Sequence, residues 1–181
     1  MEDIYAVGDC IEFKSQIWGI IPACLEQSKI VAGSVLGNKN NEYGGTVPKN
    51  TLKIVGIDLT SVGIYDPSDK DLVGAGWEIM KNMDEKGGCY KKIVLKDHKL
   101  KGAILFGEKH AIPYVNKNID KPIQEAELRE AINLYIWKCK NCGAEYDDAK
   151  KEILFKNLPD NWKCPKCNSP KSEFEKKEYD N

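Results

Sequence analysis

The segment "CKNCGAEYDDAKKEILFKNLPDNWKCPKC" (residues 139–167) carries the strongest structural signal in this chain. It holds two Cys-x-x-Cys pairs, Cys139/Cys142 and Cys164/Cys167, with 21 residues between the pairs. Each pair forms a tight turn, here called a knuckle, that offers two thiolates, and four thiolates build a tetrahedral metal site. Zn²⁺ and a single iron ion both accept this geometry. The spacing alone therefore predicts a four-cysteine metal site and leaves open a structural zinc ribbon or an iron centre.

The other three cysteines, Cys10, Cys24 and Cys89, are dispersed along the chain. An odd and scattered remainder argues against a disulfide framework and for a reducing compartment, so we expect a cytoplasmic protein. The formal net charge of the 181 residues is −1, which gives no global attraction to nucleic acid or to an anionic membrane. The longest apolar runs are too short to cross a bilayer, and no export signal is visible at the start. We therefore expect neither a nucleic-acid partner nor a membrane segment.

The chain begins with "MEDIYAVGDC", in which a β-branched and aromatic run breaks at Gly8 and Asp9. We expect a strand over residues 4–7 that ends beside a ligand. A helix is predicted from Pro22 to Gly37, because proline suits the first turn of a helix and glycine its end. Four apolar residues of this helix recur at helical spacing and predict a stripe that faces the core: Ala23, Ile30, Val31 and Val35.

Residues 51–108 have the pattern of short strands separated by turn signals. The five predicted strands are "LKIVGIDL" (52–59), "SVGIYD" (61–66), "GWEIMKNM" (76–83), "GCYKKIVLK" (88–96) and "KLKGAILFG" (99–107). "DEKGG" (84–88) and "KDHK" (96–99) are typical of hairpin connections. Tight turns between successive strands indicate a mainly antiparallel sheet, so the fold class is α+β.

A helical pattern returns at "QEAELREAINLYIW" (124–137), where Leu128, Ile132 and Tyr135 share one face. This helix is expected to lead directly into the first cysteine pair. The exposed glutamates along it are expected to form a solvated face and to carry no chemistry.

The surroundings of the four cysteines resemble rubredoxin, the small mononuclear-iron electron carrier. The matching positions are Cys139, Cys142, Gly143, Tyr146, Asp147, Leu158, Pro159, Asp160, Trp162, Cys164, Pro165, Cys167 and Phe174. The resemblance implies that the four cysteines bind one iron and that Tyr146, Trp162 and Phe174 form an aromatic core beside it. The segment between the knuckles is shorter than in most rubredoxins. Asn168 stands where the family usually has Gly, and Asn tolerates the left-handed backbone that this position requires.

The N-terminal part resembles the C-terminal third of FAD-dependent pyridine-nucleotide oxidoreductases of the NADH:rubredoxin oxidoreductase type. The matching segments are "DIYAVGDC", "GIIPACLEQSKIVAGSVLG" and "VPKNTLKIVGIDLTSVG", in that order. The resemblance implies that Gly8 lets the backbone approach FAD and that the Asp9 carboxylate accepts a hydrogen bond from its ribityl chain. It also implies that the helix start at Pro22 and Ala23 points at the flavin, where the helix dipole stabilises negative charge.

The sequence contains no G-x-G-x-x-G, so the phosphate-binding halves of the FAD and NAD(P)H sites have no counterpart in it. The resemblances therefore imply the back part of a longer flavoprotein, produced as a truncated or split gene product, with FAD only in the intact parent. The expected divisions are residues 1–45, a strand–helix remnant of the FAD-binding domain; 46–122, an α+β assembly domain; 123–137, a helical connector; and 138–181, a rubredoxin-like domain.

The expected function is electron transfer through one iron per chain, with electrons supplied by an NAD(P)H-dependent FAD oxidoreductase module or another redox partner protein. This chain alone is not expected to be catalytic. Two alternatives stay open. One is a non-catalytic zinc-ribbon assembly module that self-associates, and the other is a half-protein that completes a flavoprotein in trans.

Overall fold

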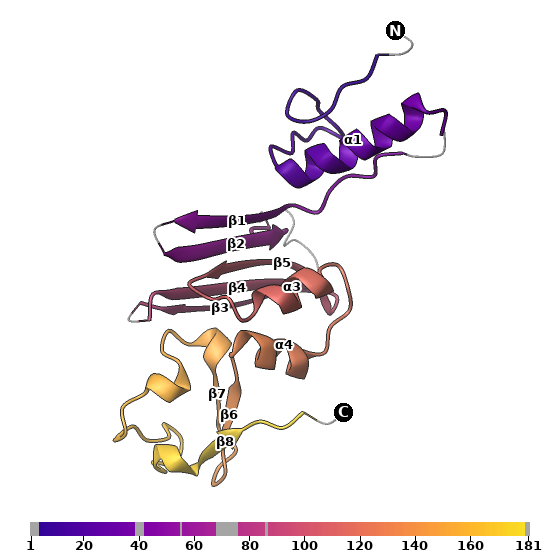
Figure 1. The fold of residues 1–181 in the computed structure, drawn as a ribbon. Coiled ribbons are helices and arrows are strands. Elements are labelled where there is room, and N and C mark those ends of the chain that lie inside the picture. Colours follow the sequence, from indigo (N-terminus) through magenta and orange to yellow (C-terminus); the bar gives the residue numbers. More distant parts are fainter. Residues whose placement is uncertain (1–3, 39–41, 55, 68–75, 86, 180–181) are drawn as a thin grey trace.

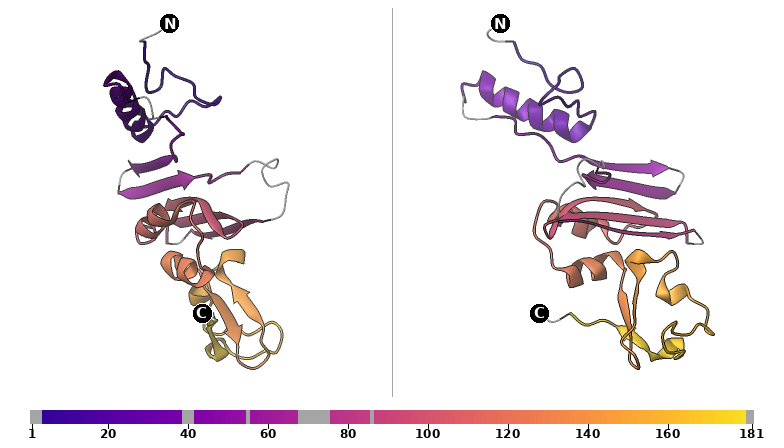
Figure 2. Two further views of the ribbon diagram at one scale, coloured as in Figure 1. Left: turned by 90° about the vertical axis from the view of Figure 1, so that its right-hand side faces the viewer. Right: turned by 180° about the vertical axis from the view of Figure 1, so that it is seen from behind.

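The computed structural model describes residues 4–38, 42–54, 56–67, 76–85 and 87–179 of the chain. In Figure 1 these residues form three parts that follow one another from one end of the molecule to the other. The first part contains helix α1, the second a five-stranded sheet with two short helices, and the third a small three-stranded sheet. Both views of Figure 2 show the same succession, with the five-stranded sheet in the middle.

The five-stranded sheet is antiparallel throughout, as predicted, and its strand order is β1-β2-β5-β4-β3. Its strands are β1 (Lys49–Ile54), β2 (Ile57–Gly63), β3 (Trp77–Asp84), β4 (Cys89–Lys96) and β5 (Lys99–Phe106). The prediction of one strand over residues 52–59 was wrong. The chain turns between β1 and β2 at Gly56, whose φ of 82° lies in the left-handed region that glycine adopts without strain.

The connection between β4 and β5 is a two-residue hairpin turn, as predicted. Asp97 and His98 form it with φ values of 49° and 58°. Positive φ at both central residues gives a turn whose twist matches that of the flanking strands. The side chain of His98 is exposed there, far from any cysteine pair in the sequence.

The main core lies where β4 and β5 meet helices α3 (Ile112–Asn118) and α4 (Glu125–Ile132). Its fully buried side chains include Ile93 and Leu105 of the sheet and Leu128 of α4, each 0% exposed. The same cluster contains Ala149 and Leu154, which belong to the C-terminal part of the chain. The sheet and the C-terminal part therefore share one continuous core.

Helix α4 is shorter than the predicted helix over residues 124–137. It ends at Ile132, and Asn133 follows in the left-handed conformation with φ 53°. Asn is one of the few residues that tolerate this conformation after a helix. Leu128 and Ile132 face the core as expected, but Tyr135 lies beyond the helix and a strand precedes the first cysteine pair.

Helix α1 (Ile21–Val35) forms as predicted, with Pro22 in its first turn and Gly37 after its end at φ 87°. The predicted core stripe was wrong in part. Ala23 is buried at 1% exposure, whereas Val35 is 65% exposed. No helix in the described part of the chain combines the length and apolarity needed to cross a membrane.

Residues 4–7 do not form the predicted strand. A strand requires backbone hydrogen bonds to a neighbouring strand, and these residues pair with no strand among those that the structure describes. Ile4 and Tyr5 are correspondingly exposed, at 68% and 49%. A run of β-branched and aromatic residues favours extended backbone, but it does not supply the pairing partner.

Candidate metal centre

The C-terminal unit (residues 136–176) is built on three short antiparallel strands in the order β7-β6-β8. They are β6 (Ile136–Cys139), β7 (Glu145–Asp147) and β8 (Phe174–Lys176), with three single 3₁₀ turns, η1 (Asp148–Lys150), η2 (Phe155–Asn157) and η3 (Lys171–Glu173). Cys139 is the last residue of β6, and Cys142 lies in the loop that joins β6 to β7. The second cysteine pair lies between η2 and η3, so the fold brings it back to the first pair from across the unit.

The two knuckles have the same backbone geometry. In each, the residue after the second cysteine donates its N–H to the carbonyl of the first cysteine. Gly143 donates to Cys139 at 2.9 Å, and Asn168 donates to Cys164 at 2.8 Å. Gly143 has φ 71° and Asn168 has φ 62°, so Asn168 takes the left-handed conformation that the sequence analysis expected at this position.

The four cysteine sulfurs form one compact cluster, with all Sγ atoms within 4.8 Å of one another. The Sγ atoms of Cys139 and Cys167 are 3.7 Å apart, and those of Cys142 and Cys164 are 3.6 Å apart. A metal–sulfur bond of about 2.3 Å requires an edge of about 3.8 Å in a sulfur tetrahedron. The cluster therefore fits one tetrahedrally bound metal ion and leaves no position for a substrate.

The cluster is closed on one side and open on the other. Cys139 and Cys164 are buried, at 1% and 0% exposure, whereas Cys142 is half-buried and Cys167 is exposed. Cys167 is thus the sulfur that a partner molecule can approach from solvent.

The two more exposed thiols, Cys142 and Cys167, have pKa values shifted in opposite directions. The Ser169 hydroxyl and backbone N–H donate to the Cys167 sulfur and lower its pKa to about 6. The Ala144 N–H lowers the pKa of Cys142, but burial and hydrogen bonds to the other three sulfurs outweigh it and raise that pKa to about 12. Thiols that share protons in this way release them when a cation binds, because metals bind thiolates.

An aromatic cluster packs against the inner side of the sulfurs, as the resemblance implied for Tyr146, Trp162 and Phe174. Its centre is a residue that the sequence analysis missed. The ring of Phe155 lies 5.6, 5.7 and 5.2 Å from the rings of those three residues. Trp137, also missed, stacks on Phe155 with 4.6 Å between ring centroids. The apolar stretch before η2 was the available signal for Phe155.

Comparison with known proteins identifies this unit. Residues 136–174 match the family model described as rubredoxin. Rubredoxin-1 of Chlorobaculum tepidum is 37% identical over 62 residues, which cover 30% of this chain and 90% of that protein. The chain belongs to the rubredoxin family. The C-terminal unit is hereafter called the rubredoxin domain.

The preceding residues 48–123 match the family model described as the rubredoxin NAD⁺ reductase C-terminal domain. The assimilatory nitrate reductase electron transfer subunit of Bacillus subtilis is 38% identical over 106 residues. That match covers 59% of this chain and 13% of that subunit, so the chain spans a small part of its relative's length. The NADH:rubredoxin oxidoreductase of Clostridium acetobutylicum shares the fold over 74% of this chain and 33% of its own, with a TM-score of 0.50 and 23% identity.

Asp148 ties the aromatic cluster to strand β6 of the rubredoxin domain. Its carboxylate, 3% exposed, accepts the backbone N–H groups of Phe155 at 2.7 Å and of Tyr135 at 3.2 Å. It also accepts the indole N–H of Trp137 at 3.1 Å. Burial raises the pKa of Asp148 above its ordinary value although these three donors favour the charged form. The carboxylate thereby holds Trp137 and Phe155 in their stacked arrangement.

The rubredoxin domain is docked on strand β3 of the sheet through specific hydrogen bonds. The side-chain amide of Asn82, buried on β3, donates to the backbone carbonyls of Asp148 at 3.3 Å and Lys151 at 3.1 Å. Asn157 donates to the Asp84 carboxylate at 3.3 Å. Together with the shared core, these contacts fix the orientation of the metal centre relative to the sheet.

A buried ion pair joins the rubredoxin domain to helix α4. Arg129, 3% exposed, donates to the two oxygens of Asp147 at 2.9 and 3.3 Å and to Glu125 at 2.7 Å. Burial raises the pKa of Asp147, but the Arg129 guanidinium and the Ala149 N–H outweigh it, and the pKa lies below its ordinary value. A bidentate arginine–carboxylate contact is both directional and strong, so it orients the domain on the helix.

The residues predicted to contact flavin lie around the start of α1. The Gly8 N–H donates to the Gln27 side chain at 2.7 Å, and Gly8 has φ 84°. Asp9 is exposed, Pro22 lies in the first turn, and Ala23 is buried beneath them. No side chain caps this helix start, Pro22 has no N–H, and the N–H of Cys24 donates to Ile20, so the N–H groups of Ile21 and Ala23 are the ones left for a ligand. The arrangement is compatible with an anionic or polar group at the helix start.

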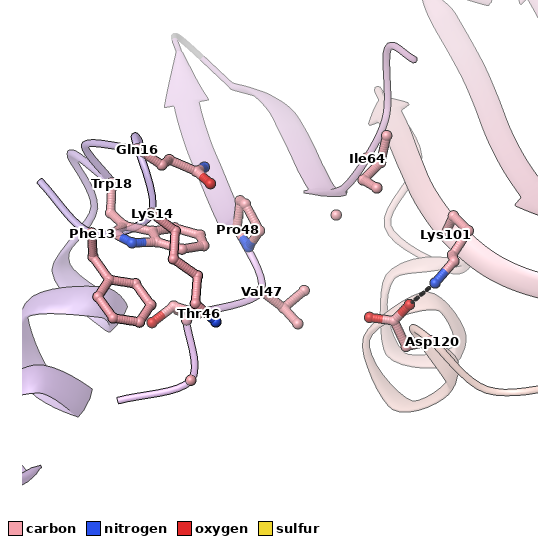
Figure 3. A pocket seen from close by; sticks show the side chains of 13 residues that line it. Phe13, Lys14, Gln16, Trp18, Thr46, Val47, Pro48, Ile64, Lys101 and Asp120 are labelled. Atoms are coloured by element: carbon pink, nitrogen blue, oxygen red, sulfur yellow. Dashed lines mark hydrogen bonds and ion pairs between the residues drawn. The ribbon is translucent and has the colours of Figure 1, made fainter. Parts of the chain in front are cut away.

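A cavity of about 360 Å³ lies between this N-terminal part and the sheet (Figure 3). Phe13, Trp18 and Pro48 line one side, and the ion pair between Lys101 and Asp120 lies on the other. The indole N–H of Trp18 is buried and has no hydrogen-bond partner among the described residues. Neither the residues at the start of α1 nor any cysteine lines the cavity, so it belongs to neither predicted site.

The two predicted sites lie at opposite ends of the molecule. Helix α1 lies beyond the β1 edge of the sheet, and the rubredoxin domain lies beyond the β3 edge (Figures 1 and 2). Five strands with a spacing of about 4.8 Å put about 19 Å between β1 and β3. The start of α1 and the cysteine cluster are therefore separated by at least the whole width of the sheet.

Proposed function

We propose that this chain carries electrons through one iron ion bound by Cys139, Cys142, Cys164 and Cys167. The observation that carries the proposal is the cysteine cluster, whose Sγ separations of 3.6 and 3.7 Å fit one tetrahedral ion. When bound, iron supplies one-electron chemistry by changing between its ferrous and ferric states. The two knuckles, which share one backbone geometry, hold the four sulfurs in place, so little rearranges when the charge changes. The Ser169 N–H and hydroxyl stabilise negative charge on the exposed sulfur of Cys167.

The alternative is a zinc ribbon that only stabilises an assembly module. Four thiolates bind Zn²⁺ and iron with the same geometry, so the sulfur positions do not separate the two ions. The match to rubredoxin and the aromatic cluster around Phe155 support iron.

Protein purified without oxygen from iron-replete cells is expected to contain one iron per chain. It should be red when oxidised and should bleach on chemical reduction, because the visible absorption of the ferric tetrathiolate is lost in the ferrous form. Metal analysis and a visible spectrum make the measurement. A colourless protein that holds zinc after iron-replete expression would support the assembly module.

We further propose that the electrons come from an FAD- and NAD(P)H-dependent oxidoreductase module. The match of residues 48–123 to a reductase domain supports this donor. FAD would accept a hydride and release its electrons singly. In this proposal residues 1–45 contribute Gly8, Asp9, Pro22 and Ala23 to the edge of the FAD site, and residues 46–122 support assembly. Residues 123–137 then connect them to the metal-binding residues 138–181.

Replacing Asp9 by Ala tests the flavin-facing role of the N-terminal part. In a complex of this chain with a flavoprotein module supplied in trans, the variant is expected to retain FAD about 10- to 100-fold more weakly. The reason is the loss of one charge-assisted hydrogen bond worth roughly 1.5–3 kcal/mol. FAD retention is measured by ultrafiltration. Glu12→Ala, a nearby exposed carboxylate, is the control, and unchanged retention in Asp9→Ala would exclude the proposed contact.

A further inference from the structure

The two knuckle loops, residues 139–144 and 163–169, contain basic residues but no acidic ones. They contain three lysines, Lys140, Lys163 and Lys166, and no Asp or Glu. Residues 138–181 as a whole contain ten Lys and nine Asp or Glu. A nearly neutral domain thus presents a basic surface at its metal-binding end. These two loops are hereafter called the knuckle face.

The positive charge of the knuckle face is centred on the second loop. Lys163 and Lys166 are exposed, and neither forms an ion pair within the part of the chain that the structure describes. Lys140 lies 3.6 Å from Glu175, and both side chains are about half exposed, so this pair is weak. Lys166 immediately precedes Cys167, so an exposed lysine without an ion-pair partner among the described residues is the chain neighbour of the exposed cysteine.

The acidic residues on the flanking strands do not cancel this charge. Glu145 of β7 pairs with Lys177 at 3.0 Å, and Glu175 of β8 pairs with Lys140. Both carboxylates therefore already have basic partners. Lys163 and Lys166 leave the knuckle face with a net positive charge.

The knuckle face also points away from the rest of the molecule. Strand β6 begins after α4 and ends at the first cysteine, and β7 returns to η1, which contacts β3 of the sheet. The β6–β7 loop therefore lies at the end of the rubredoxin domain that is farthest from the sheet (Figure 1). The contacts of Asn82 and Arg129 hold the domain in this orientation.

We propose that the knuckle face docks an acidic protein surface on a separate electron-donor molecule. The inference rests on the proposed electron-transfer function. Electron transfer rates fall steeply with distance, so a donor must approach the exposed Cys167 sulfur closely. A flavin bound at the start of α1 lies beyond the far edge of the sheet from the cysteines of its own chain, so the flavin that reduces this centre belongs to the FAD module of a second molecule. Complementary charge speeds encounter and suppresses wrong partners, which gives Lys163 and Lys166 their role.

The surface is tested first with the zinc-loaded full chain, labelled with ¹⁵N, and poly-L-glutamate as an acidic polypeptide probe. Chemical-shift changes are expected in the two knuckle loops and should weaken about tenfold at high salt, because exposed charges are screened. The double variant Lys163→Gln/Lys166→Gln should lose them. Lys117→Gln/Lys121→Gln, which removes two exposed lysines beside the sheet, should keep them. Shift changes confined to other residues would overturn the proposal.

The redox consequence is tested with the iron-loaded chain and two one-electron oxidants of opposite charge. Ferricyanide takes one electron from the ferrous centre and becomes ferrocyanide, while tris(phenanthroline)cobalt(III) takes one and becomes cobalt(II). In Lys163→Gln/Lys166→Gln the ferricyanide rate is expected to fall several-fold and the cobalt rate to rise, with both differences vanishing at about 0.5 M salt. Equal effects on both oxidants would overturn the proposal.

The outcomes separate this inference from the proposed function. A colourless, redox-inactive protein with an intact poly-L-glutamate footprint would refute iron electron transfer but support an acidic protein partner for the knuckle face. A 15-base-pair DNA duplex serves as the competing macromolecule. DNA binding at the same loops that is tighter than poly-L-glutamate binding at the same salt concentration would make the face a nucleic-acid surface and overturn the proposal.

Discussion

Cys164→Ser is expected to remove the metal, the red colour and the ordered structure of the knuckles together. Cys164 is 0% exposed and supplies one of four sulfurs in a cluster that has no spare ligand. A tetrathiolate ion contributes on the order of 10 kcal/mol to the folding of a small domain, which exceeds what its few buried side chains supply. The measurements are metal content, the visible spectrum and amide hydrogen exchange.

Amide hydrogen exchange also shows which part of the Cys164→Ser protein loses its ordered structure. Protection is expected to disappear at the N–H of Asn168 and Gly143, which close the knuckles, and to persist at β4 and β5. Cys10→Ser, an exposed thiol outside the cluster, is the matched control and should keep the iron. A Cys164→Ser protein that still binds one iron with an unchanged spectrum would contradict the assignment of this ligand.

Arg129→Ala is expected to lower the free energy of unfolding by about 3–5 kcal/mol, because it leaves the Asp147 carboxylate largely buried without its partner. Asp147 has an exposed side-chain fraction of 11% and Arg129 of 4%. Urea denaturation of the iron-loaded protein measures the change. Lys150→Ala is the control, since Lys150 lies 3.6 Å from the same carboxylate but is 78% exposed, and it should change stability by less than about 1 kcal/mol.

The pH dependence distinguishes a lost charge pair from lost packing. Arg129 lowers the pKa of Asp147 in the folded protein, so the pair stabilises the fold above the unfolded pKa of about 3.9. This contribution is lost as the pH falls through the lower folded pKa. The difference between the parent and Arg129→Ala should therefore shrink below about pH 4. The double variant Arg129→Met/Asp147→Asn, which has no charge at either position, should be more stable than Arg129→Ala. A loss of stability in Arg129→Ala that does not change with pH would contradict the ion-pair account.

Much of the cysteine cluster could be predicted from the sequence because its signals are local. The two Cys-x-x-Cys pairs define the knuckles, and Asn168 was correctly expected to accept the left-handed backbone. The hairpin turn at Asp97 and His98 and the antiparallel sheet were predictable for the same reason, since short turns allow only antiparallel neighbours. Each of these features depends on residues a few positions apart.

Other features of the site were missed because their cause lies far away in the sequence. Phe155 carries no motif of its own, yet it is the centre of the aromatic cluster. The helical periodicity over residues 124–137 continued past Ile132, but the chain leaves the helix at Asn133, and Tyr135 and Trp137 then contact the Asp148 carboxylate. The strand predicted over residues 4–7 does not form. Its residues have the composition of a strand, but no strand in the described residues pairs with them.

The four-cysteine motif, the knuckles and the antiparallel sheet of this protein follow from local patterns in the sequence. The place of the cysteine cluster in the molecule and the direction that it faces depend on the tertiary structure. The Asn82 side chain donates a hydrogen bond to the carbonyl of Asp148, which is 66 residues away in the sequence. Lys91 donates one to the carbonyl of Ile132, which is 41 residues away. Such contacts depend on the complementarity of two folded surfaces, which no local spacing encodes. The Asn82 contact docks the rubredoxin domain on β3, and the Lys91 contact holds the end of α4 on β4. The cysteine cluster is thereby separated from the start of α1 by the width of the sheet.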